Sequence, residues 1–269
     1  RGKIGNENVR FISGTDEHGQ KIQRKAEELG KSSRAFVDEM SQDFRDVLAQ
    51  LNISNDDFIR TTEERHIRGA QEFWRLLQTR GFIEKREFEG LYCVGCEEYK
   101  TEKELVDGQC PLHNATPEIL KEENYFFLLS QCEAHVKKWL AMNTVIPEHR
   151  KKEMMEFVNG GLQDIPISRP IEKCSWGIPV PGDNTHVMYV WVEAITNYIN
   201  ALGFGANDEW KEWWTSTTHI VGKDINRFHA VMWPAMLFAA GFEMPMHVAI
   251  HGFITVDDKK MSKTIGNVI

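Results

Sequence analysis

Four residues of this chain have the types and the spacing of a metal site. Cys93 and Cys96 are separated by two residues, and so are Cys110 and His113. Zinc in a structural site takes four nitrogen or sulfur ligands, and each two-residue gap lets one tight turn present two of them. The alternatives are two unrelated turns, or a redox-active Cys-x-x-Cys pair, which would open a helix and would have no second pair beside it. The spacing favours one structural zinc ion, with all four positions filled by protein.

A second group of polar residues follows the first apolar run of the chain, in the sequence GTDEHG at 14–19. An α/β sheet presents its site residues where the strands end. Asp16 is placed to bind a cationic group of a substrate, and His18 to donate a hydrogen bond to a phosphate. The same pattern fits an aspartate that caps a helix and has solvated neighbours. The residues alone leave both interpretations open.

The sequence VGKDINRFH at 221–229 has a similar form, because an apolar run ends at Gly222 and a carboxylate follows at Asp224. A carboxylate at a strand end can accept hydrogen bonds from both hydroxyls of a ribose. Asp224 is therefore a candidate nucleotide ligand, and a helix cap is the alternative. His229, five residues later, is on its own residue pattern more typical of a buried core histidine.

Two aromatic residues, Trp191 and Tyr198, lie across a predicted turn from a strand to a helix. Aromatic walls suit apolar or thioether ligands, since sulfur packs well against rings. The alternative is that both rings belong to the plain core.

Near the end of the chain, Lys260 and Lys263 flank a Met-Ser pair in the sequence KMSKT at 260–264. Lysine ammonium groups on a loop can neutralise charge that develops on phosphate oxygens. A solvated turn is the alternative. The sequence contains no GxxxxGK[ST] motif, which argues against a P-loop kinase or ATPase.

The elements that must position these residues follow from apolar periodicity and from glycine and proline punctuation. We expect helices at 20–29, 33–51, 61–81 (with a capping box of Thr61 and Glu64), 131–141, 147–161, 195–203 and 225–241. We expect strands at the run before Gly14 and at 123–130, 186–194, 218–224 and 245–256, with short strands and turns around the cysteines.

Strand and helix alternate in the second half of the chain, which indicates a Rossmann-like α/β fold with a doubly wound parallel sheet. The irregular, cysteine-bearing segment interrupts this sheet. We expect the first part of the sheet domain at 1–81, the insertion at 82–187, the second part at 188–250, and the start of a lysine-bearing loop region at 251–269.

Composition excludes several classes of protein. The 269 residues carry 32 basic and 40 acidic side chains, a formal net charge of −8, which argues against a protein that coats nucleic acid non-specifically. No apolar run is long enough to span a membrane, and the polar first ten residues are not a signal peptide. The five cysteines do not form the pattern of a secreted disulfide scaffold, so we expect a reducing compartment.

Together these patterns resemble one family. KMSKT is similar to the KMSKS loop of class I aminoacyl-tRNA synthetases. GTDEHG, YVWVEAITNY, VGKDINRFH, HGFITV and the spacing of the zinc ligands resemble the methionyl-tRNA synthetases specifically, in the same order and over nearly the whole chain. The resemblance implies a Rossmann-like catalytic domain that is interrupted by a connective peptide with a zinc knuckle.

The resemblance also implies roles in binding methionine. Asp16 would pair with the α-ammonium group, Trp191 and Tyr198 would form walls of the pocket, and His229 would lie near the thioether. Arg169 matches an arginine of the connective peptide that packs near the entrance of the active site.

For ATP, the resemblance implies the following residues: Gly222 and Asp224 at the ribose, His251 and Gly252 near the adenosine, the backbone of Ile254 at the adenine, and Lys260 and Lys263 at the pyrophosphate. Methionine would be activated to methionyl-adenylate and then transferred to the 3′ end of tRNA(Met). Catalysis would come from positioning and from charge neutralisation by Lys260, Lys263 and His18, together with Mg²⁺.

The chain departs from the family pattern in several places. Position 193 is glutamate where aspartate is expected, and position 264 is threonine where serine is usual. The HIGH-type sequence and the anticodon-binding domain are absent from the chain, which begins with Arg1. We therefore expect a fragment that alone activates methionine very poorly, and near-normal pyrophosphate exchange by it would contradict this.

Three other functions stay open on the sequence. They are another class I synthetase, a non-catalytic tRNA-binding relative of a synthetase, and a zinc-knuckle protein that binds nucleic acid, the last disfavoured by the net charge. We expect no membrane and no DNA partner, and a cytoplasmic protein, with an organelle as the alternative.

Overall fold

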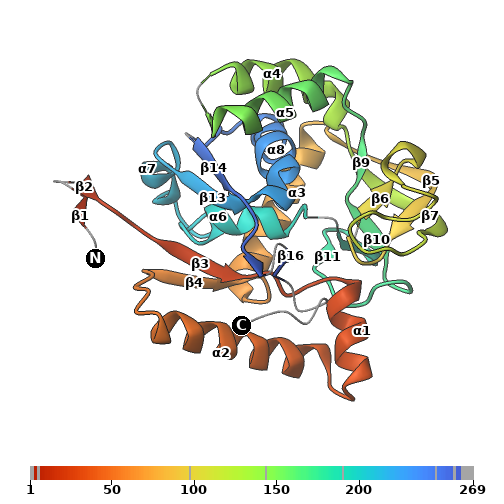
Figure 1. Ribbon diagram of the computed structural model, residues 1–269, viewed down its shortest axis with the longest axis horizontal. Coiled ribbons are helices and arrows are strands. Elements are labelled where there is room, and N and C mark those ends of the chain that lie inside the picture. The colour runs from red at the N-terminus through yellow and green to blue at the C-terminus, as the bar shows by residue number, and fades with distance from the viewer. Residues whose placement is uncertain are drawn as a thin grey trace. The chain divides into compact units, whose positions relative to one another are not determined.

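The computed structural model describes residues 3–4, 7–96, 98–142, 144–189, 191–245, 247–256 and 259–261 (Figure 1). The chain packs into two compact units. Unit 1 contains Arg1–Phe127 and Ile165–Trp210, and unit 2 contains Leu128–Asp164 and Lys211–Ile269. This division differs from the expected boundaries at 81, 187 and 250, because residues of the predicted insertion are shared between the two units. Those boundaries remain a prediction about domains.

Unit 1 contains mostly antiparallel strands and three long helices. Its elements are β1 (Lys3–Ile4), β2 (Glu7–Asn8), β3 (Ile12–Thr15), α1 (Gln20–Glu28), α2 (Ser33–Gln50), β4 (Asp57–Arg60), α3 (Glu64–Thr79), β5 (Ile83–Cys93), β6 (Glu98–Lys100), η1 (Glu102–Glu104), β7 (Glu118–Phe127), β9 (Ile165–Pro166), β10 (Ser168–Pro170), β11 (Pro179–Val180), β12 (Asp183–Met188), η3 (Ala194–Thr196) and α6 (Asn197–Asn200).

Unit 2 is built from a parallel sheet and the helices around it. Its elements are η2 (Leu129–Cys132), α4 (Glu133–Ala141), β8 (Val145–Ile146), α5 (Glu148–Asn159), α7 (Trp210–Trp214, which begins at the boundary), β13 (Thr218–Gly222), η4 (Lys223–Ile225), the π-helix η5 (Phe228–Met232), α8 (Trp233–Ala240), β14 (His247–His251), β15 (Thr255–Val256) and β16 (Lys259–Lys260).

The strand that carries the first site residues, β3, pairs in parallel with β4 from Ile12 with Asp57 to Thr15 with Arg60. Gly14 lies inside this strand and not in a turn, contrary to the sequence-based expectation. The turn comes later, at Gly19, whose φ is 107°. Glycine is needed at position 14 for another reason. A Cβ there would overlap the backbone carbonyl oxygen of Ile59 on the paired strand.

The predicted helices of unit 1 are confirmed with small shifts of their ends. Gly30 and Gly81 follow α1 and α3 with φ of 65° and 78°, the left-handed geometry that glycine adopts without strain. The predicted capping box of Thr61 is wrong, because α3 has its N-cap at Glu63 without a side-chain cap bond. The hydroxyl of Thr61 instead accepts a hydrogen bond from the backbone N–H of Glu17, at 2.9 Å.

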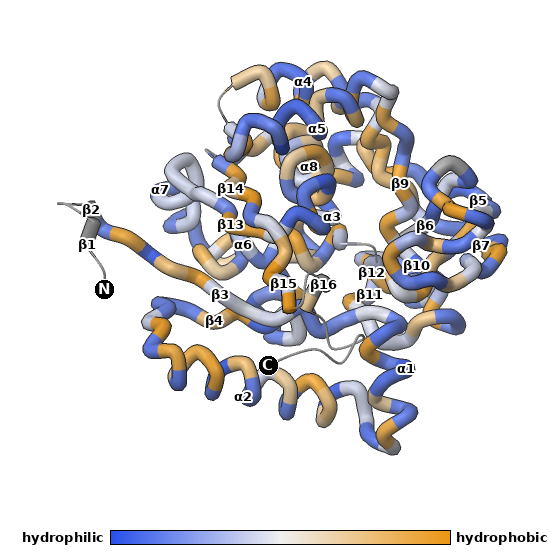
Figure 2. The backbone as a smooth tube through the Cα atoms, viewed as in Figure 1, coloured by the Kyte–Doolittle hydropathy of each residue, from blue (hydrophilic) through white to orange (hydrophobic). Residues whose placement is uncertain are grey.

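The helix α2 is amphipathic, and apolar and polar positions alternate along it (Figure 2). Its side chains Val37 and Ser41 are buried. The predicted apolar stripe continues toward the C-terminal end of the helix, but there Phe44, Val47 and Leu51 are exposed. The periodicity therefore predicted the helix correctly and its buried face only in part.

The cysteine-bearing segment is more regular than expected. β5 and β7 form a long antiparallel ladder in a four-stranded sheet of order β6-β5-β7-β9. The first predicted zinc ligand, Cys93, is the last residue of β5, an inner strand of this sheet.

The strand predicted at 186–194 ends earlier, at Met188. Trp191 has a φ of 65°, and its carbonyl accepts a hydrogen bond from the N–H of Ile195 at 3.0 Å. The chain therefore turns at Trp191 before the short helices η3 and α6, and a strand cannot continue through a residue with this φ.

Unit 2 confirms the predicted parallel strands. β13, β14 and β8 form one parallel sheet in the order β13-β14-β8, and β14 lies in the middle. The strand β13 is buried on one face only, since Ile220 on the other face is 75% exposed. The predicted apolar helix begins as the π-helix η5, continues as α8 and ends at Gly241 with a φ of 81°.

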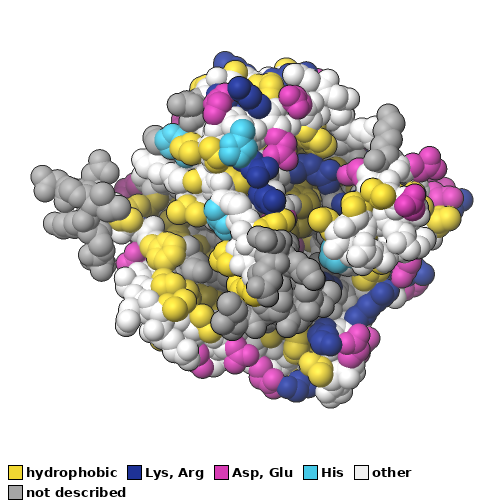
Figure 3. Space-filling view, viewed as in Figure 1, with side chains coloured by type: hydrophobic (Ala, Val, Ile, Leu, Met, Phe, Trp, Pro, Cys, Tyr) yellow, Lys and Arg dark blue, Asp and Glu magenta, His cyan; other side chains and the backbone are white. Residues whose placement is uncertain are grey.

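Acidic, basic and hydrophobic side chains are interspersed over the face seen in Figure 3, in keeping with a modest net charge. Within the described ranges, no helix has both the length and the apolarity to cross a membrane.

Replacing Gly14 by alanine tests the close approach of β3 and β4. We expect Gly14→Ala to lower the free energy of unfolding by about 1–3 kcal/mol, because the new methyl group forces the two strands apart. Urea denaturation measures this. Gly252→Ala is the matched control, since a Cβ at Gly252 meets open space, and it should change the free energy little. Equal effects of the two substitutions would contradict the packing described here.

Candidate functional site

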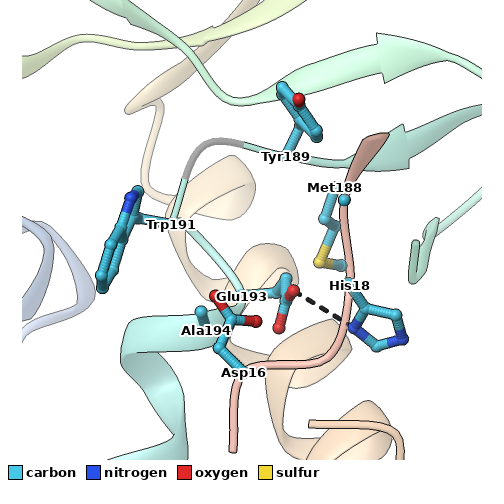
Figure 4. A pocket seen from close by; sticks show the side chains of 8 residues that line it. Asp16, His18, Met188, Tyr189, Trp191, Glu193 and Ala194 are labelled. Atoms are coloured by element: carbon cyan, nitrogen blue, oxygen red, sulfur yellow. Dashed lines mark hydrogen bonds and ion pairs between the residues drawn. The ribbon is translucent and has the colours of Figure 1, made fainter. Parts of the chain in front are cut away.

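Unit 1 contains a partly open hollow (Figure 4). It lies between the loop after β3 and the turn after β12. Its lining residues are Asp16, His18, Gly19, Met188, Tyr189, Trp191, Glu193 and Ala194. The structure thus brings together three predicted residues from two separate motifs, Asp16 and His18 from one and Trp191 from the other. Sequence reasoning had given no role to the other lining residues.

The loop after β3 is held by the buried carboxylate of Glu17. This carboxylate accepts hydrogen bonds from the hydroxyls of Thr15 and Thr62 and from Nε of Arg60, the last at 2.7 Å. The backbone carbonyl of Glu17 accepts from the indole N–H of Trp176. Glu17 is thereby fixed on both its side chain and its backbone, and this fixes the positions of its two neighbours, Asp16 and His18.

A buried carboxylate lies at the floor of the hollow. Oε1 of Glu193 is 3.2 Å from Nδ1 of His18, and Oε2 is 3.0 Å from Nε2 of His66. Burial alone would raise the pKa of Glu193, but the charge of His18 and the hydrogen bonds from His18 and His66 lower it to about 2. Burial alone would lower the pKa of His18, but Glu193, and more weakly Asp16 and Glu17, raise it above its ordinary value.

The second histidine, His66, is fixed on its far side by Asn200 of α6. Nδ2 of Asn200 donates to Nδ1 of His66 at 3.1 Å and to the backbone carbonyl of the same residue at 3.3 Å. Nδ1 therefore accepts, and the ring carries its N–H on Nε2, where it donates to Glu193. Asn200 packs against Gly69 of α3, where any side chain would overlap its amide.

The aromatic walls of the hollow are differently built. Trp191 has the left-handed φ of 65°, which is strained for a tryptophan and which the surrounding structure must hold in place. Tyr198, the other predicted wall, lies on α6 in the same unit, and burial and the charge of Asp16 raise its pKa. It is not among the lining residues of the hollow.

Tyr189, a wall residue that the sequence did not reveal, is supported from behind. Its hydroxyl shares a hydrogen bond with that of Tyr92, and the guanidinium group of Arg169 lies over both rings, at 5.3 and 4.5 Å from their centroids. Arg169 is buried and pairs with Glu122 at 2.9 Å. The arginine singled out by the sequence therefore packs behind a wall of the hollow.

The predicted zinc ligands also come together. The four ligand atoms of Cys93, Cys96, Cys110 and His113 lie within 4.8 Å of one another. Nδ1 of His113 is 3.3 Å from the sulfur of Cys96, which is itself 3.5 Å from the sulfur of Cys110. The imidazole of His113 lies against Gly95, where a Cβ would overlap the ring. Three sulfurs and one nitrogen at these separations could hold one metal ion.

Most of the residues predicted to bind ATP lie at one edge of the parallel sheet of unit 2. Gly222 and His251 are opposite each other in register, at the carboxyl ends of β13 and β14. Asp224 follows in η4, and a Cβ on Gly222 would come within 2.7 Å of its Oδ1. Nδ1 of His251 is 2.7 Å from the carbonyl oxygen of Gly252. The carboxyl edge of parallel strands is where open α/β sheets bind their ligands.

The lysine-bearing stretch begins as a hairpin of β15 and β16. Ile254 is exposed, and its carbonyl accepts a hydrogen bond from the N–H of Met261 at 2.9 Å. Lys260 is paired with Thr255 in the hairpin. The side chain of Lys260 and the whole of Lys263 lie outside the described residues.

His229, predicted near a thioether, is buried within the π-helix η5 of unit 2. Its Nδ1 donates to the carbonyl of Ile225 at 3.0 Å. Burial lowers the pKa of His229 to about 4, so the ring is neutral near pH 7. Because the hollow belongs to unit 1, the grouping of His229 with Trp191 remains a prediction.

Comparison with known proteins gives a consistent result. The sequence matches the protein family described as "tRNA synthetases class I (M)" over residues 1–116 and 101–269. A methionine–tRNA ligase of Clostridium perfringens is 45% identical over 266 residues, which are 97% of this chain and 41% of that protein.

Two solved structures of Mycobacterium tuberculosis methionyl-tRNA synthetase are also similar. The complex with methionyl-adenylate superimposes with a TM-score of 0.92 at 39% identity, over 98% of this chain and 53% of that one. The free form superimposes with a TM-score of 0.76 at 32% identity, over 93% of this chain and 57% of that one. The chain thus spans about half the length of the proteins it matches.

Replacing Glu17 by glutamine tests how the loop of the hollow is held. We expect Glu17→Gln to lower the free energy of unfolding by about 3 kcal/mol, because it leaves Arg60 beside a neutral amide in a largely buried place. Asp38→Asn is the control. It removes the other carboxylate of the same arginine, but Asp38 is 49% exposed against 3% for Glu17, so a loss below about 1 kcal/mol is expected. Chemical denaturation measures the free energy of unfolding of both variants, and equal losses would contradict this account of the loop.

Proposed function

Since the chain belongs to the family of class I tRNA synthetases designated (M), we propose that the protein activates L-methionine with ATP and transfers it to tRNA(Met). The observation that carries the proposal is the hollow of unit 1. It combines a carboxylate, Asp16, with aromatic and thioether walls, Trp191, Tyr189 and Met188, as an amino acid with an apolar, sulfur-containing side chain requires. The protein would act where tRNA is charged, in the cytoplasm or in an organelle.

The likeness to solved structures supports the same proposal. This chain is closer in structure to a synthetase complex that contains methionyl-adenylate than to the free form of that enzyme, by TM-scores of 0.92 and 0.76.

In the first step, a carboxylate oxygen of methionine attacks the α-phosphorus of ATP, and the bond to pyrophosphate breaks. Asp16 would hold the α-ammonium group, and Trp191 and Tyr198 the side chain, with His229 at the thioether. His18 would place positive charge beside the reacting carboxylate. No side chain forms a covalent bond, so the rate would come from alignment and charge neutralisation.

The nucleotide is assigned to the edge of the sheet in unit 2. Asp224 would accept hydrogen bonds from the ribose hydroxyls, and Gly222 has no side chain that would collide with its carboxylate. His251, Gly252 and the backbone of Ile254 would surround the adenosine. The Mg²⁺ that accompanies ATP and the loop lysines would balance the charge of the leaving pyrophosphate.

The loop lysines proposed to balance the charge of the pyrophosphate are Lys260 and Lys263. In the second step, a ribose hydroxyl at the 3′ end of tRNA attacks the carbonyl carbon of the adenylate, and AMP leaves. The hydroxyl proton passes to a phosphate oxygen or to water. The product is methionyl-tRNA.

Discrimination among amino acids would rest on the walls of the hollow. A missing methylene in an apolar pocket changes binding by only about 1–3 kcal/mol. Contacts of a thioether with the rings of Trp191 and Tyr189 would add to this.

The cluster of three cysteines and His113 is proposed to hold a structural zinc ion. Tetrahedral bonds of about 2.3 Å to sulfur place the ligand atoms about 3.8 Å apart. The observed separations of 3.3, 3.5, 3.8 and 3.9 Å are close to this value. The ion would cross-link the turn after β5 to the turn at Cys110.

Methionine-dependent ATP–pyrophosphate exchange by the whole gene product tests the function. We expect exchange with methionine well above that with leucine, isoleucine, valine or cysteine. Asp16→Asn should raise the KM for methionine by at least about 30-fold, because the ammonium group loses its charge partner in the hollow. Asp43→Asn, on the exposed side of α2, is the control. Exchange with another amino acid would favour a different synthetase, and tRNA binding without exchange a non-catalytic relative.

Metal analysis tests the zinc site. The purified chain is expected to contain about one zinc per chain, and Cys93→Ala to lose it, because three ligands bind far more weakly than four. Cys132→Ala is the control, since Cys132 is buried away from the cluster in unit 2. Gly95→Ala should also lower zinc retention, because its methyl group displaces the His113 ring. Full zinc content in Cys93→Ala would exclude the site.

A further inference from the structure

Glu193 connects three segments that are far apart in the sequence. It lies in the turn after β12, it meets His18 of the loop after β3, and it meets His66 of α3. The separations along the chain are 175 and 127 residues. The side chains of these three residues are 6%, 9% and 0% exposed, respectively. An arrangement this polar is costly to bury unless its charges are matched and its hydrogen bonds are made.

The arrangement is also directional. Asn200 fixes the ring of His66 so that its Nε2–H is directed to one oxygen of Glu193. The other oxygen is then left to face Nδ1 of His18. With Nδ1 engaged, His18 keeps Nε2–H as the donor for a ligand. His18 and Glu193 both line the hollow, whereas His66 lies behind it.

We propose that Glu193 and His66 are positioning residues that hold His18 as the cation of the substrate pocket, directly beside the carboxylate of Asp16. His66 orients Glu193, and Glu193 orients His18 and stabilises its positive charge. The inference rests on the proposed function, because it assigns His18 to the carboxylate of the amino acid and to the acyl phosphate that forms from it.

The chemistry of the ligand agrees with this arrangement. A free amino acid is a zwitterion, so a pocket needs one anion for its ammonium group and one cation for its carboxylate. Asp16 and His18 are two residues apart and line the same hollow. During activation the carboxylate oxygen bonds to phosphorus, and an imidazolium nearby balances the negative charge without transferring its proton.

The surroundings of His18 favour the protonated ring. The groups that face it are the carboxylates of Glu193, Asp16 and Glu17, the last already paired with Arg60, and the ring of Trp176 at 5.5 Å. Burial lowers the pKa of His18, but these carboxylates, with Glu193 foremost, raise it above 6.5. Activity that needs the imidazolium is therefore present below the raised pKa and is lost as the pH rises through it.

Replacing Glu193 by glutamine isolates the effect. In the wild type, the hollow carries the charges of Asp16, Glu193 and protonated His18, which sum to −1. At a pH between the His18 pKa of Glu193→Gln and that of the wild type, His18 of the variant is neutral and Asp16 alone gives −1. The net charge is the same, so a change in substrate binding reports the local loss of the imidazolium and not a weaker overall field.

Histidine-selective NMR of the full chain gives a readout that needs no activity. His18→Gln identifies the signal. We expect the pKa of His18 to lie above 6.5 in the wild type and to fall by at least one unit in Glu193→Gln. Glu193→Asp keeps the charge and should restore part of the shift. His66→Phe keeps a ring but removes the hydrogen bond to Glu193. The pKa of His18 should then stay raised, because Glu193 keeps its charge, while kcat should fall, because Glu193 is no longer oriented.

The pH profile of kcat/KM for methionine, measured by pyrophosphate exchange in the whole gene product, completes the test. The alkaline limb of the wild-type profile should move to lower pH in Glu193→Gln by the shift that NMR measures. Asp43→Asn should leave it in place. The inference is overturned if the pKa of His18 is the same in Glu193→Gln as in the wild type. It is also overturned if this pKa falls but the alkaline limb of the kcat/KM profile stays at the same pH. If the wild type shows no pyrophosphate exchange with methionine, the proposed function itself is overturned. This result needs only the wild-type protein and so is distinct from the result for the variants.

Discussion

The candidate pocket depends on the burial of charged carboxylates that are completely paired. Glu17 is held by two hydroxyls and Arg60, and its backbone by Thr61 and Trp176. A carboxylate without these partners would be expelled to water or protonated, and the loop would move with it. The fixed loop in turn presents Asp16 and His18 on either side of the buried residue. The pocket thus depends on Glu17, a residue of the motif that does not line it.

Local spacing was enough to predict that four cysteine and histidine residues come together, and that Gly222 and Asp224 lie where a strand of a parallel sheet ends. The four ligands lie in two pairs with a two-residue gap, and a turn brings each pair together whatever the rest of the chain does. Gly222 and Asp224 follow a strand end directly, and the sheet places them at its carboxyl edge. In both cases the information is contained in a few consecutive residues, so the sequence pattern could predict the geometry.

The residues that the sequence did not reveal act across long separations. His66 meets Glu193 over 127 residues, and no periodicity in α3 distinguishes it from an ordinary buried histidine. Gly14 was expected at a turn because glycine usually marks one, but its role is to admit Ile59 of the neighbouring strand. Thr61 had the spacing of a helix cap, yet its hydroxyl was required by Glu17. Tertiary contacts overrode the local preference at each of these positions.

The order of the chain through the two units has a consequence for biosynthesis. The short strand β8 pairs with β14, so Val145 leaves the ribosome about a hundred residues before its partner Val248. Between them the chain returns to unit 1 and completes it with β9 to α6. A nascent chain therefore carries α4 before the helix α8 that it contacts, and β8 before its partner β14. Such pairings of high sequence separation fold slowly, and the half-made unit 2 is the species that chaperones would meet.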